Sequence, residues 1–309
     1  MTTVQIAVPR KGRPLEAVLE RVAGHAETAG AANATGRVDE VISTLRLEKA
    51  VTKDERDLDR SVYERLADYS DPEDPYAPEY TLLRDARDGF PRRVVFDSLT
   101  LPTPIGEVQL VGREEPFRAL RKHEFALGFD SADLVLEEVV ELRPEPLATL
   151  ADVNERIDPM DTDVRVAGGL GDTVYHTLLA TPETRGDGGD PLDRSFVSDY
   201  EGELCISPRY ERLVEAVLGT DALRDVEFTY PTPESEKEEE AAIADTGLGV
   251  YLTVTGSTAR DHGLLLGERL FPSETVLLEN VHELDDHARE LAGLLIDESE
   301  TELVAPTTD

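Results

Sequence analysis

Two short segments of the chain combine a glycine with basic or hydroxyl side chains at a place where a strand should give way to a helix. The first is residues 6–13 (IAVPRKGR), in which alternating apolar residues predict a strand that ends in a basic turn. Pro14 suits the first turn of a helix, and a helix N-terminus favours an anion. Lys11 and Arg13 are therefore candidate phosphate ligands, although a solvated basic turn is the alternative interpretation.

The second segment is residues 252–263 (LTVTGSTARDHG), which also run from a strand pattern into a helix pattern. Gly256 would let the backbone approach a ligand closely, and Thr255, Ser257 and Thr258 can donate from their hydroxyls. These four residues predict a phosphate-binding loop. The alternative is an ordinary helix start, with Ser257 or Thr258 as the N-cap.

The elements that would position both segments alternate between strands and helices. Strands are expected near residues 4–8, 93–96, 108–111, 125–129, 173–180, 203–206, 226–230, 249–254 and 275–278. Helices are expected from Pro14 and Pro116 and over residues 54–69, 132–142, 210–218, 258–266 and 284–295. Residues 30–45 are small and polar and predict a loop, with one further strand near residues 41–47. This alternation predicts an α/β protein in two lobes.

Composition limits the partners. The chain has 309 residues and carries 66 acidic residues against 31 basic ones, a formal charge of −35, which disfavours non-specific binding to nucleic acid or anionic lipid. Such a charge is best tolerated where salt screens it, which predicts a salt-adapted cytoplasm. No apolar run of 18 residues and no signal peptide are present, and the single cysteine, Cys205, excludes a disulfide framework and a Cys-built zinc site.

The two segments resemble motifs of the ATP phosphoribosyltransferases, the first enzymes of histidine biosynthesis. Residues 6–13 resemble the family's amino-terminal signature, and residues 255–264 (TGSTARDHGL) resemble its phosphate-binding loop. Three further stretches occur in the family's order: its arginine-bearing strand at residues 108–113 (VQLVGR), its "DLGITGxD" segment at residues 126–133 (ALGFDSAD), and the strand after the loop at residues 273–280 (SETVLLEN).

This resemblance implies a two-lobed, type II periplasmic-binding-protein-like fold with a cleft between the lobes. The first lobe would comprise residues 1–142 and 283–309, with an insertion at about 45–90 that has no counterpart in the family. The second lobe would comprise residues 143–282 and carry the phosphate loop. The family's C-terminal regulatory domain has no counterpart in this sequence.

The resemblance also implies a reaction that depends on Mg²⁺ and transfers the phosphoribosyl group of phosphoribosyl pyrophosphate to a purine nucleotide, which is ATP in the family. It adds Arg113 and Glu238 to the candidate ligands, Arg113 for a phosphate and Glu238 near the ribose hydroxyls or the metal. Several family positions are changed: two aspartates are replaced by Ala126 and Tyr251, and a glycine by Ser131, while Ala259, Ala244 and Thr246 also depart from the family pattern.

A non-catalytic protein that senses a phosphorylated metabolite, as a homo-oligomer or a regulatory subunit, is therefore the alternative to a transferase. It would keep the basic and hydroxyl ligands without needing the full set of carboxylates.

Overall fold

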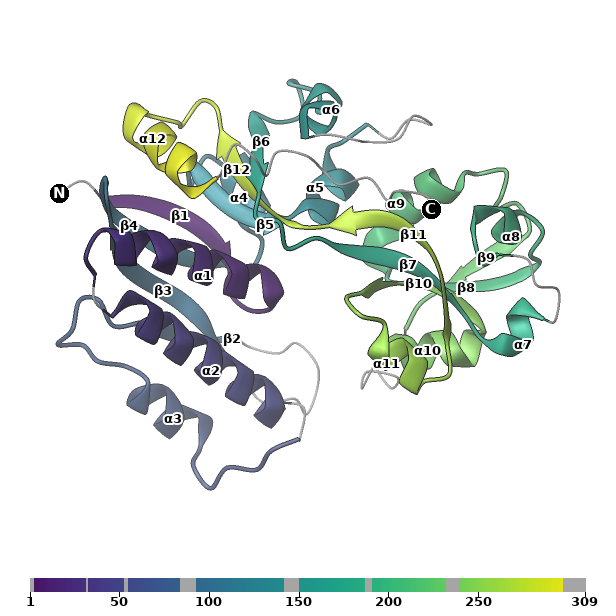
Figure 1. Cartoon of the computed structure of the whole chain (residues 1–309), viewed down its shortest axis with the longest axis horizontal. Coiled ribbons are helices and arrows are strands. Elements are labelled where there is room, and N and C mark those ends of the chain that lie inside the picture. The colour runs from purple at the N-terminus through teal and green to yellow at the C-terminus, as the bar shows by residue number, and fades with distance from the viewer. Residues whose placement is uncertain are drawn as a thin grey trace. The chain divides into compact units, whose positions relative to one another are not determined.

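A computed structural model describes residues 3–31, 33–52, 55–83, 93–141, 150–186, 191–231 and 239–296. The chain divides into two compact α/β units, coloured from purple to yellow along the chain in Figure 1. Among the described residues, the first unit comprises those within 1–131, 159–172 and from 275 onward, and the second comprises those within 132–158 and 173–274. Because the chain passes between the units several times, each is assembled from separate stretches of sequence. The predicted two-lobed α/β fold is confirmed.

A seven-stranded sheet forms the centre of the first unit, in the order β2-β3-β4-β1-β5-β12-β6. Its strands are β1 (Thr3–Pro9), β2 (Glu79–Leu83), β3 (Arg93–Thr103), β4 (Gly106–Arg113), β5 (Leu127–Ser131), β6 (Val164–Gly169) and β12 (Thr275–Asn280). Strand β1 is parallel to both of its neighbours, β4 and β5, whereas β12 is antiparallel to β5 and to β6. The carboxyl ends of β1, β4 and β5 therefore lie at the same edge of the sheet.

Helices α1 (Arg13–Thr28), α2 (Ala34–Thr52), α4 (Pro116–Arg121) and α12 (Asp286–Leu295) pack on this sheet. Helix α2 replaces the loop that was predicted for residues 30–45, and the strand predicted near residues 41–47 is wrong as well. Its buried residues Val38, Val41 and Ile42 follow helical spacing and join the core with α1. Small residues between them left only a weak apolar pattern, and packing against α1 and β3 decides the structure.

The insertion contributes an edge strand and one short helix to the first unit. Helix α3 (Val62–Asp68) is shorter than the helix predicted over residues 54–69, because Ser61 caps it and forms a capping box with Glu64. The helix is fastened to α2 by Arg65, which donates from Nε and Nη2 to the buried Glu48 carboxylate at 2.7 and 2.8 Å. Both partners lie within residues 45–90, so this buried ion pair fixes α3 against the end of α2, the helix through which the insertion begins.

The second unit has a five-stranded sheet in the order β11-β7-β10-β8-β9. Its strands are β7 (Val174–Ala180), β8 (Gly202–Ile206), β9 (Val226–Thr229), β10 (Leu248–Thr253) and β11 (Leu265–Ser273). Its helical segments are α5 (Ala132–Glu138), α6 (Leu150–Glu155), α7 (Pro182–Arg185), α8 (Arg194–Ser198), η1 (Pro208–Tyr210), α9 (Glu211–Leu218), α10 (Glu239–Thr246) and α11 (Ser257–Asp261). A small apolar cluster beneath α10 and α11 includes Leu179, Cys205 and Ile243. Cys205 is thus a buried core residue.

The units divide at other places than the crossings expected near residues 143 and 282. Residues 164–169 and 275–280, which were expected in the second lobe, form β6 and β12 of the first unit's sheet, and β6 was not predicted as a strand. The reason is the pairing of β12 with β5, which places Thr275 opposite Ser131 and buries the apolar residues Val276 to Leu278 completely. Of the helices in the described part of the chain, none is long and apolar enough to cross a membrane.

Candidate functional site

The basic turn after β1 lies at the sheet edge where β1 and β4 end. The parallel register puts Pro9 opposite Arg113, the last residue of β4. Lys11 and Arg13 follow within four residues of Pro9, so the structure brings all three predicted basic ligands to one edge of the first unit's sheet. Gly12 precedes helix α1 with a φ of 86°, a conformation that favours glycine, and its carbonyl accepts from the Glu16 N–H.

Carboxylates of the same chain already contact these three basic side chains. Arg13 pairs closely with the carboxylate of Asp172 and also donates to the Asp172 carbonyl oxygen at 2.6 Å. Lys11 Nζ lies 3.6 Å from Glu114, and Arg113 Nε lies 4.0 Å from Glu124. The last two distances are long for ion pairs between exposed side chains, so their carboxylates hold Lys11 and Arg113 only weakly.

Arg113 has a second contact that orients it. Its guanidinium carbon stands 4.7 Å from the centroid of the Phe125 ring, and its Nη1 donates to the Gly112 carbonyl at 3.1 Å. A guanidinium held against an aromatic face keeps its outer N–H groups available for a planar acceptor such as a phosphate.

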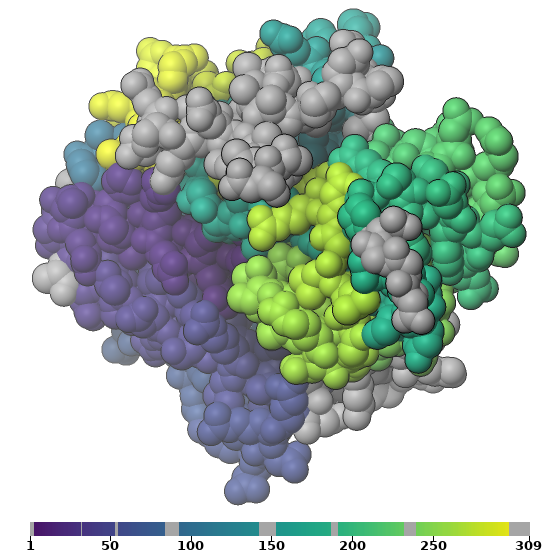
Figure 2. Space-filling model, turned by 45° about the vertical axis from the view of Figure 1, so that its right-hand side comes forward, coloured from purple at the N-terminus to yellow at the C-terminus, as the bar shows by residue number. Residues whose placement is uncertain are grey.

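The predicted phosphate loop of the second unit follows β10 directly. Thr255 and Ser257 are exposed, and their hydroxyl oxygens lie 3.1 Å apart, while Gly256 between them is buried. In Figure 2 the yellow-green atoms of this region lie at the molecular surface. Gly256 occupies the N-cap position of α11 and no side chain caps this helix, so the N-cap role considered for Ser257 or Thr258 is not realised.

The helix after this loop is shorter than predicted. It ends at Asp261 in place of residue 266, because the positive-φ Gly263 terminates it and Leu265 already begins β11. A helix of five residues has a weak dipole, so a phosphate at this loop would depend on the hydroxyls, the backbone N–H groups and nearby cations.

Gly256 is required by the backbone and by its neighbour in β11. Its φ of 69° lies in the left-handed region, and a Cβ added there would approach Leu266 Cδ2 to 2.2 Å. Strand β11 therefore runs directly beside the loop.

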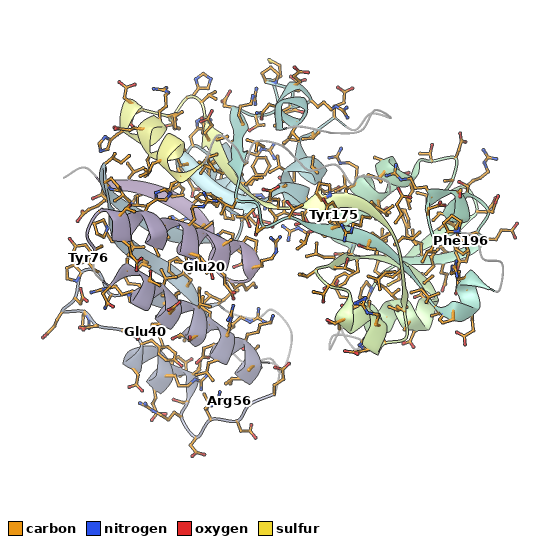
Figure 3. All side chains as sticks on the ribbon, viewed as in Figure 1. Glu20, Glu40, Arg56, Tyr76, Tyr175 and Phe196 are labelled. Carbon is orange, nitrogen blue, oxygen red and sulfur yellow. The ribbon has the colours of Figure 1, made fainter. Side chains whose placement is uncertain are left out.

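Two arginines of the second unit, Arg260 and Arg269, were not among the predicted ligands. Arg260 donates from Nη2 to the Thr255 carbonyl oxygen at 2.8 Å. Arg269, on β11, places its guanidinium carbon 4.9 Å from the centroid of the Tyr175 ring, which Figure 3 labels on β7. Arg260 lies in the loop motif itself, whereas the position of Arg269 depends on strand pairing, which the local sequence does not reveal.

Glu238 lies outside the described residues, but its neighbour Glu239 begins α10 beside Tyr251. Burial raises the pKa of Glu239, although the Tyr251 hydroxyl donates a hydrogen bond to its carboxylate. Burial and the charges of Glu239 and Glu240 raise the pKa of Tyr251. The tyrosine that replaces the family's aspartate is thus a neutral donor held against a carboxylate.

A buried histidine and aspartate form a second polar group in this unit. His176 Nε2 lies 3.0 Å from Asp133, and both side chains are almost completely buried. The His176 ring stacks on Phe271 with the centroids 4.3 Å apart. Burial alone would raise the pKa of Asp133, but hydrogen bonds with His176, Tyr210 and Ser273 hold that pKa below its ordinary value. Asp133 therefore ties α5 to the sheet.

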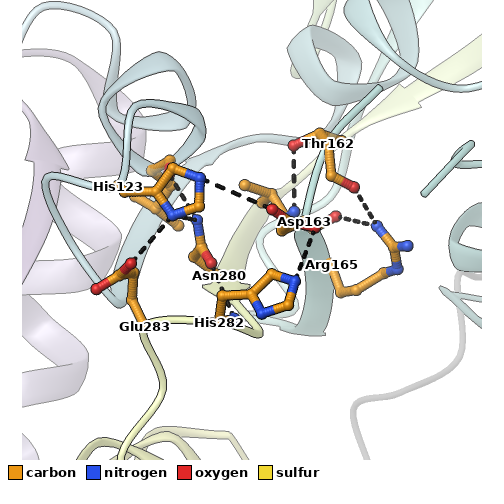
Figure 4. A network of polar contacts seen from close by, with 9 residues as sticks. His123, Thr162, Asp163, Arg165, Asn280, His282 and Glu283 are labelled. Atoms are coloured by element: carbon orange, nitrogen blue, oxygen red, sulfur yellow. Dashed lines mark hydrogen bonds and ion pairs between the residues drawn. The ribbon is translucent and has the colours of Figure 1, made fainter. Parts of the chain in front are cut away.

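Figure 4 shows a third polar network, at the end of β12 in the first unit. Asp163 lies between two histidines, 3.3 Å from His282 Nε2 and 3.7 Å from His123 Nε2, and His123 Nδ1 lies 3.1 Å from Glu283. The buried Asn280 donates to the Leu120 carbonyl at 2.9 Å. Even so, within the described ranges no group of three or more histidines, cysteines and carboxylates is arranged to hold a metal ion.

A family model agrees with the motifs over nearly the whole chain. The model for halobacterial ATP phosphoribosyltransferase matches residues 1–305. No curated protein matches the chain.

Solved structures give only distant likenesses. The ATP phosphoribosyl transferase (HisG:HisZ) complex from Thermotoga maritima is 13% identical, with a TM-score of 0.40 and coverage of 94% of both chains. YhfZ from Shigella flexneri is 12% identical, with a TM-score of 0.38 and coverage of 97% of this chain and 92% of that one. At these TM-scores the likenesses identify no function. Because the family model matches residues 1–305, the chain belongs to the family of halobacterial ATP phosphoribosyltransferases.

Proposed function

We propose that this protein transfers the phosphoribosyl group of phosphoribosyl pyrophosphate to a purine nucleotide, ATP in the first instance, and releases pyrophosphate. The observation that carries this proposal is the family match over residues 1–305, together with both phosphate-type segments in their family order. In the reaction, N1 of adenine forms a bond to C1 of the ribose while the bond from C1 to the pyrophosphate oxygen breaks. No nucleophile of the protein is needed, so positioning and charge neutralisation supply the catalysis.

Each phosphate segment has a distinct part in this proposal. The hydroxyls of Thr255, Ser257 and Thr258 and the backbone at Gly256 would bind the 5-phosphate of the donor. Lys11 and Arg113 would stabilise the negative charge of the leaving pyrophosphate, because their present carboxylate contacts are long and exposed. Arg13 would join them only by exchanging its close partner Asp172 for a phosphate.

Mg²⁺ is proposed to enter as a complex with the pyrophosphate group. Magnesium keeps several waters and binds largely through substrate phosphates, with one or two carboxylates from the protein. Glu239 beside Tyr251 is the described carboxylate that could assist at the ribose or the metal.

The proposal is tested by following pyrophosphate release in molar KCl with Mg²⁺, phosphoribosyl pyrophosphate and ATP, ADP, AMP or GTP. The variant Thr258→Val removes one loop hydroxyl, and Thr35→Val, at an exposed position of α2, is the matched control. We expect release that requires ATP, falls strongly in Thr258→Val and is unchanged in Thr35→Val.

Ligand-dependent melting separates this proposal from the sensor alternative. A rise in melting temperature with phosphoribosyl pyrophosphate but no release with any nucleotide would overturn the transferase and leave a metabolite-binding protein. Neither a shift nor release would contradict both functions.

A further inference from the structure

Arg269 differs from most arginines of this acidic chain. Ion pairs hold Arg13, Arg65, Arg194 and others to carboxylates, but within the described ranges no carboxylate pairs with Arg269. The adjacent acid, Glu268, is engaged by Arg194 at 2.9 Å. In a chain with a formal charge of −35, an exposed guanidinium without an anionic partner is a feature that needs a reason.

Strand pairing places Arg269 level with Tyr251 of β10, and its guanidinium reaches from there toward the end of the sheet at which the phosphate loop begins. Arg269 is opposite Thr177 in β7, and its guanidinium reaches along β7 to the Tyr175 ring at 4.9 Å. Tyr175 is in turn opposite Thr253 of β10, two residues before Thr255. Farther back in β11, Leu266 is the side chain that a Cβ at Gly256 would meet.

The loop needs positive charge to bind a phosphate monoester. Its own contribution is hydroxyls and backbone N–H groups, which are neutral, and α11 has only five residues. Arg260 supplies one guanidinium, which the Thr255 carbonyl holds against the loop. An arginine stacked on an aromatic ring keeps its planar set of donors oriented, and such a set matches two oxygens of a phosphate.

We propose that Arg269, oriented by the ring of Tyr175, is a binding residue for the 5-phosphate of the phosphoribosyl donor at residues 255–258. The inference rests on the proposed function for the identity of its ligand. It adds a phosphate-binding residue on β11, outside the loop motif of residues 255–264. Arg269 and Arg260 would together neutralise a phosphate dianion that the hydroxyls alone only orient.

The test measures equilibrium binding of two probes, ribose 5-phosphate and phosphoribosyl pyrophosphate, to the full-length chain in molar KCl. Arg269→Met removes the charge and keeps much of the side-chain length, and Arg269→Lys restores a charge without the planar donors. The matched control is Arg224→Met, at an exposed arginine of the same unit that forms an ion pair with the nearby Asp221.

We expect Arg269→Met to weaken both probes equally, by at least about tenfold, with the melting temperature of the unliganded protein close to wild type. Arg269→Lys should recover part of the loss, and Arg224→Met should bind both probes as wild type does. Unchanged binding in Arg269→Met, or a loss confined to phosphoribosyl pyrophosphate, would overturn the assignment to the 5-phosphate. Wild-type binding of ribose 5-phosphate without any transfer to a nucleotide would refute the proposed function while leaving this assignment intact.

Discussion

Arg13 and Asp172 form a close ion pair in the first unit, and the same carboxylate also fixes the start of β12. Asp172 accepts hydrogen bonds from the Thr275 backbone N–H and from the Thr275 hydroxyl, each at 2.7 Å. A basic residue predicted as a phosphate ligand is therefore neutralised by its own chain when no ligand is present. Asp172 thus links Arg13, at the N-terminus of α1, to Thr275, the first residue of β12.

Replacing this carboxylate should destabilise the first unit. Asp172→Asn keeps an oxygen for Thr275 but removes the charge that faces Arg13, so we expect a loss of about 1–3 kcal/mol in the free energy of unfolding. Urea unfolding in molar KCl measures it, with Asp221→Asn as the control for an exposed ion pair worth about 0–1 kcal/mol. Equal effects of the two substitutions would show that the Arg13 contact is no stronger than a surface pair.

Substitution of Gly256 should damage the fold as well as the ligand site. Gly256→Val forces a β-branched residue into a φ of 69° and against Leu266, so we expect a destabilisation of about 1–3 kcal/mol with lost phosphate binding. The loop motif alone does not reveal this loss of stability, because the contact of Gly256 with Leu266 of β11 is set by tertiary structure. A double variant that adds Leu266→Ala should regain only part of the stability, since the backbone strain persists. A Gly256→Val protein with wild-type unfolding would contradict the conformation described for the loop.

The buried pair of Asp133 and His176 should give the second unit an acid-sensitive component of stability. Because the folded-state pKa of Asp133 lies below its ordinary value of 3.8, its ionised form stabilises the fold above that value. The contribution is lost as the pH falls through the depressed folded-state pKa. Asp133→Asn should therefore be less stable than wild type at neutral pH, and the difference should shrink below about pH 4. Urea unfolding of both proteins as a function of pH measures the difference; a gap that widens in acid would have the wrong sign.

Local sequence patterns predicted the elements that bury one clear apolar face, and they failed where long-range packing decides. Strands β1 and β10 and the short helix α4 were predicted from alternation and from Pro116. Helix α2 was not predicted because small residues interrupt its apolar stripe. The helix is stabilised by packing of that stripe against α1 and β3, which the local sequence does not show.

The candidate site divides in the same way. Lys11, Arg13 and the residues of the loop stand in recognisable motifs next to strand ends, so sequence could find them. Arg269 could not be found, because its relation to the loop passes through two strand pairings, from β11 to β7 and from β7 to β10. The partner of Arg13 was equally hidden, since Asp172 is 159 residues away along the chain.

Salt should control the stability of the whole chain. With a formal charge of −35, carboxylates repel one another over the Debye length, which grows from about 3 Å at 1 M salt to about 10 Å at 0.1 M. We expect the melting temperature to fall steeply as KCl is diluted over this range. Sorbitol at matched water activity is the control for effects other than screening; a melting temperature independent of KCl would contradict adaptation to salt.

The most direct test of the proposed activity is the mass of the nucleotide after incubation with phosphoribosyl pyrophosphate and Mg²⁺ in molar KCl. The account predicts that ATP gains one phosphoribosyl group, that one pyrophosphate is released for each nucleotide modified, and that the product forms much more slowly with the Thr258→Val protein. ATP of unchanged mass beside intact phosphoribosyl pyrophosphate, with a folded wild-type protein that binds the donor, would contradict it.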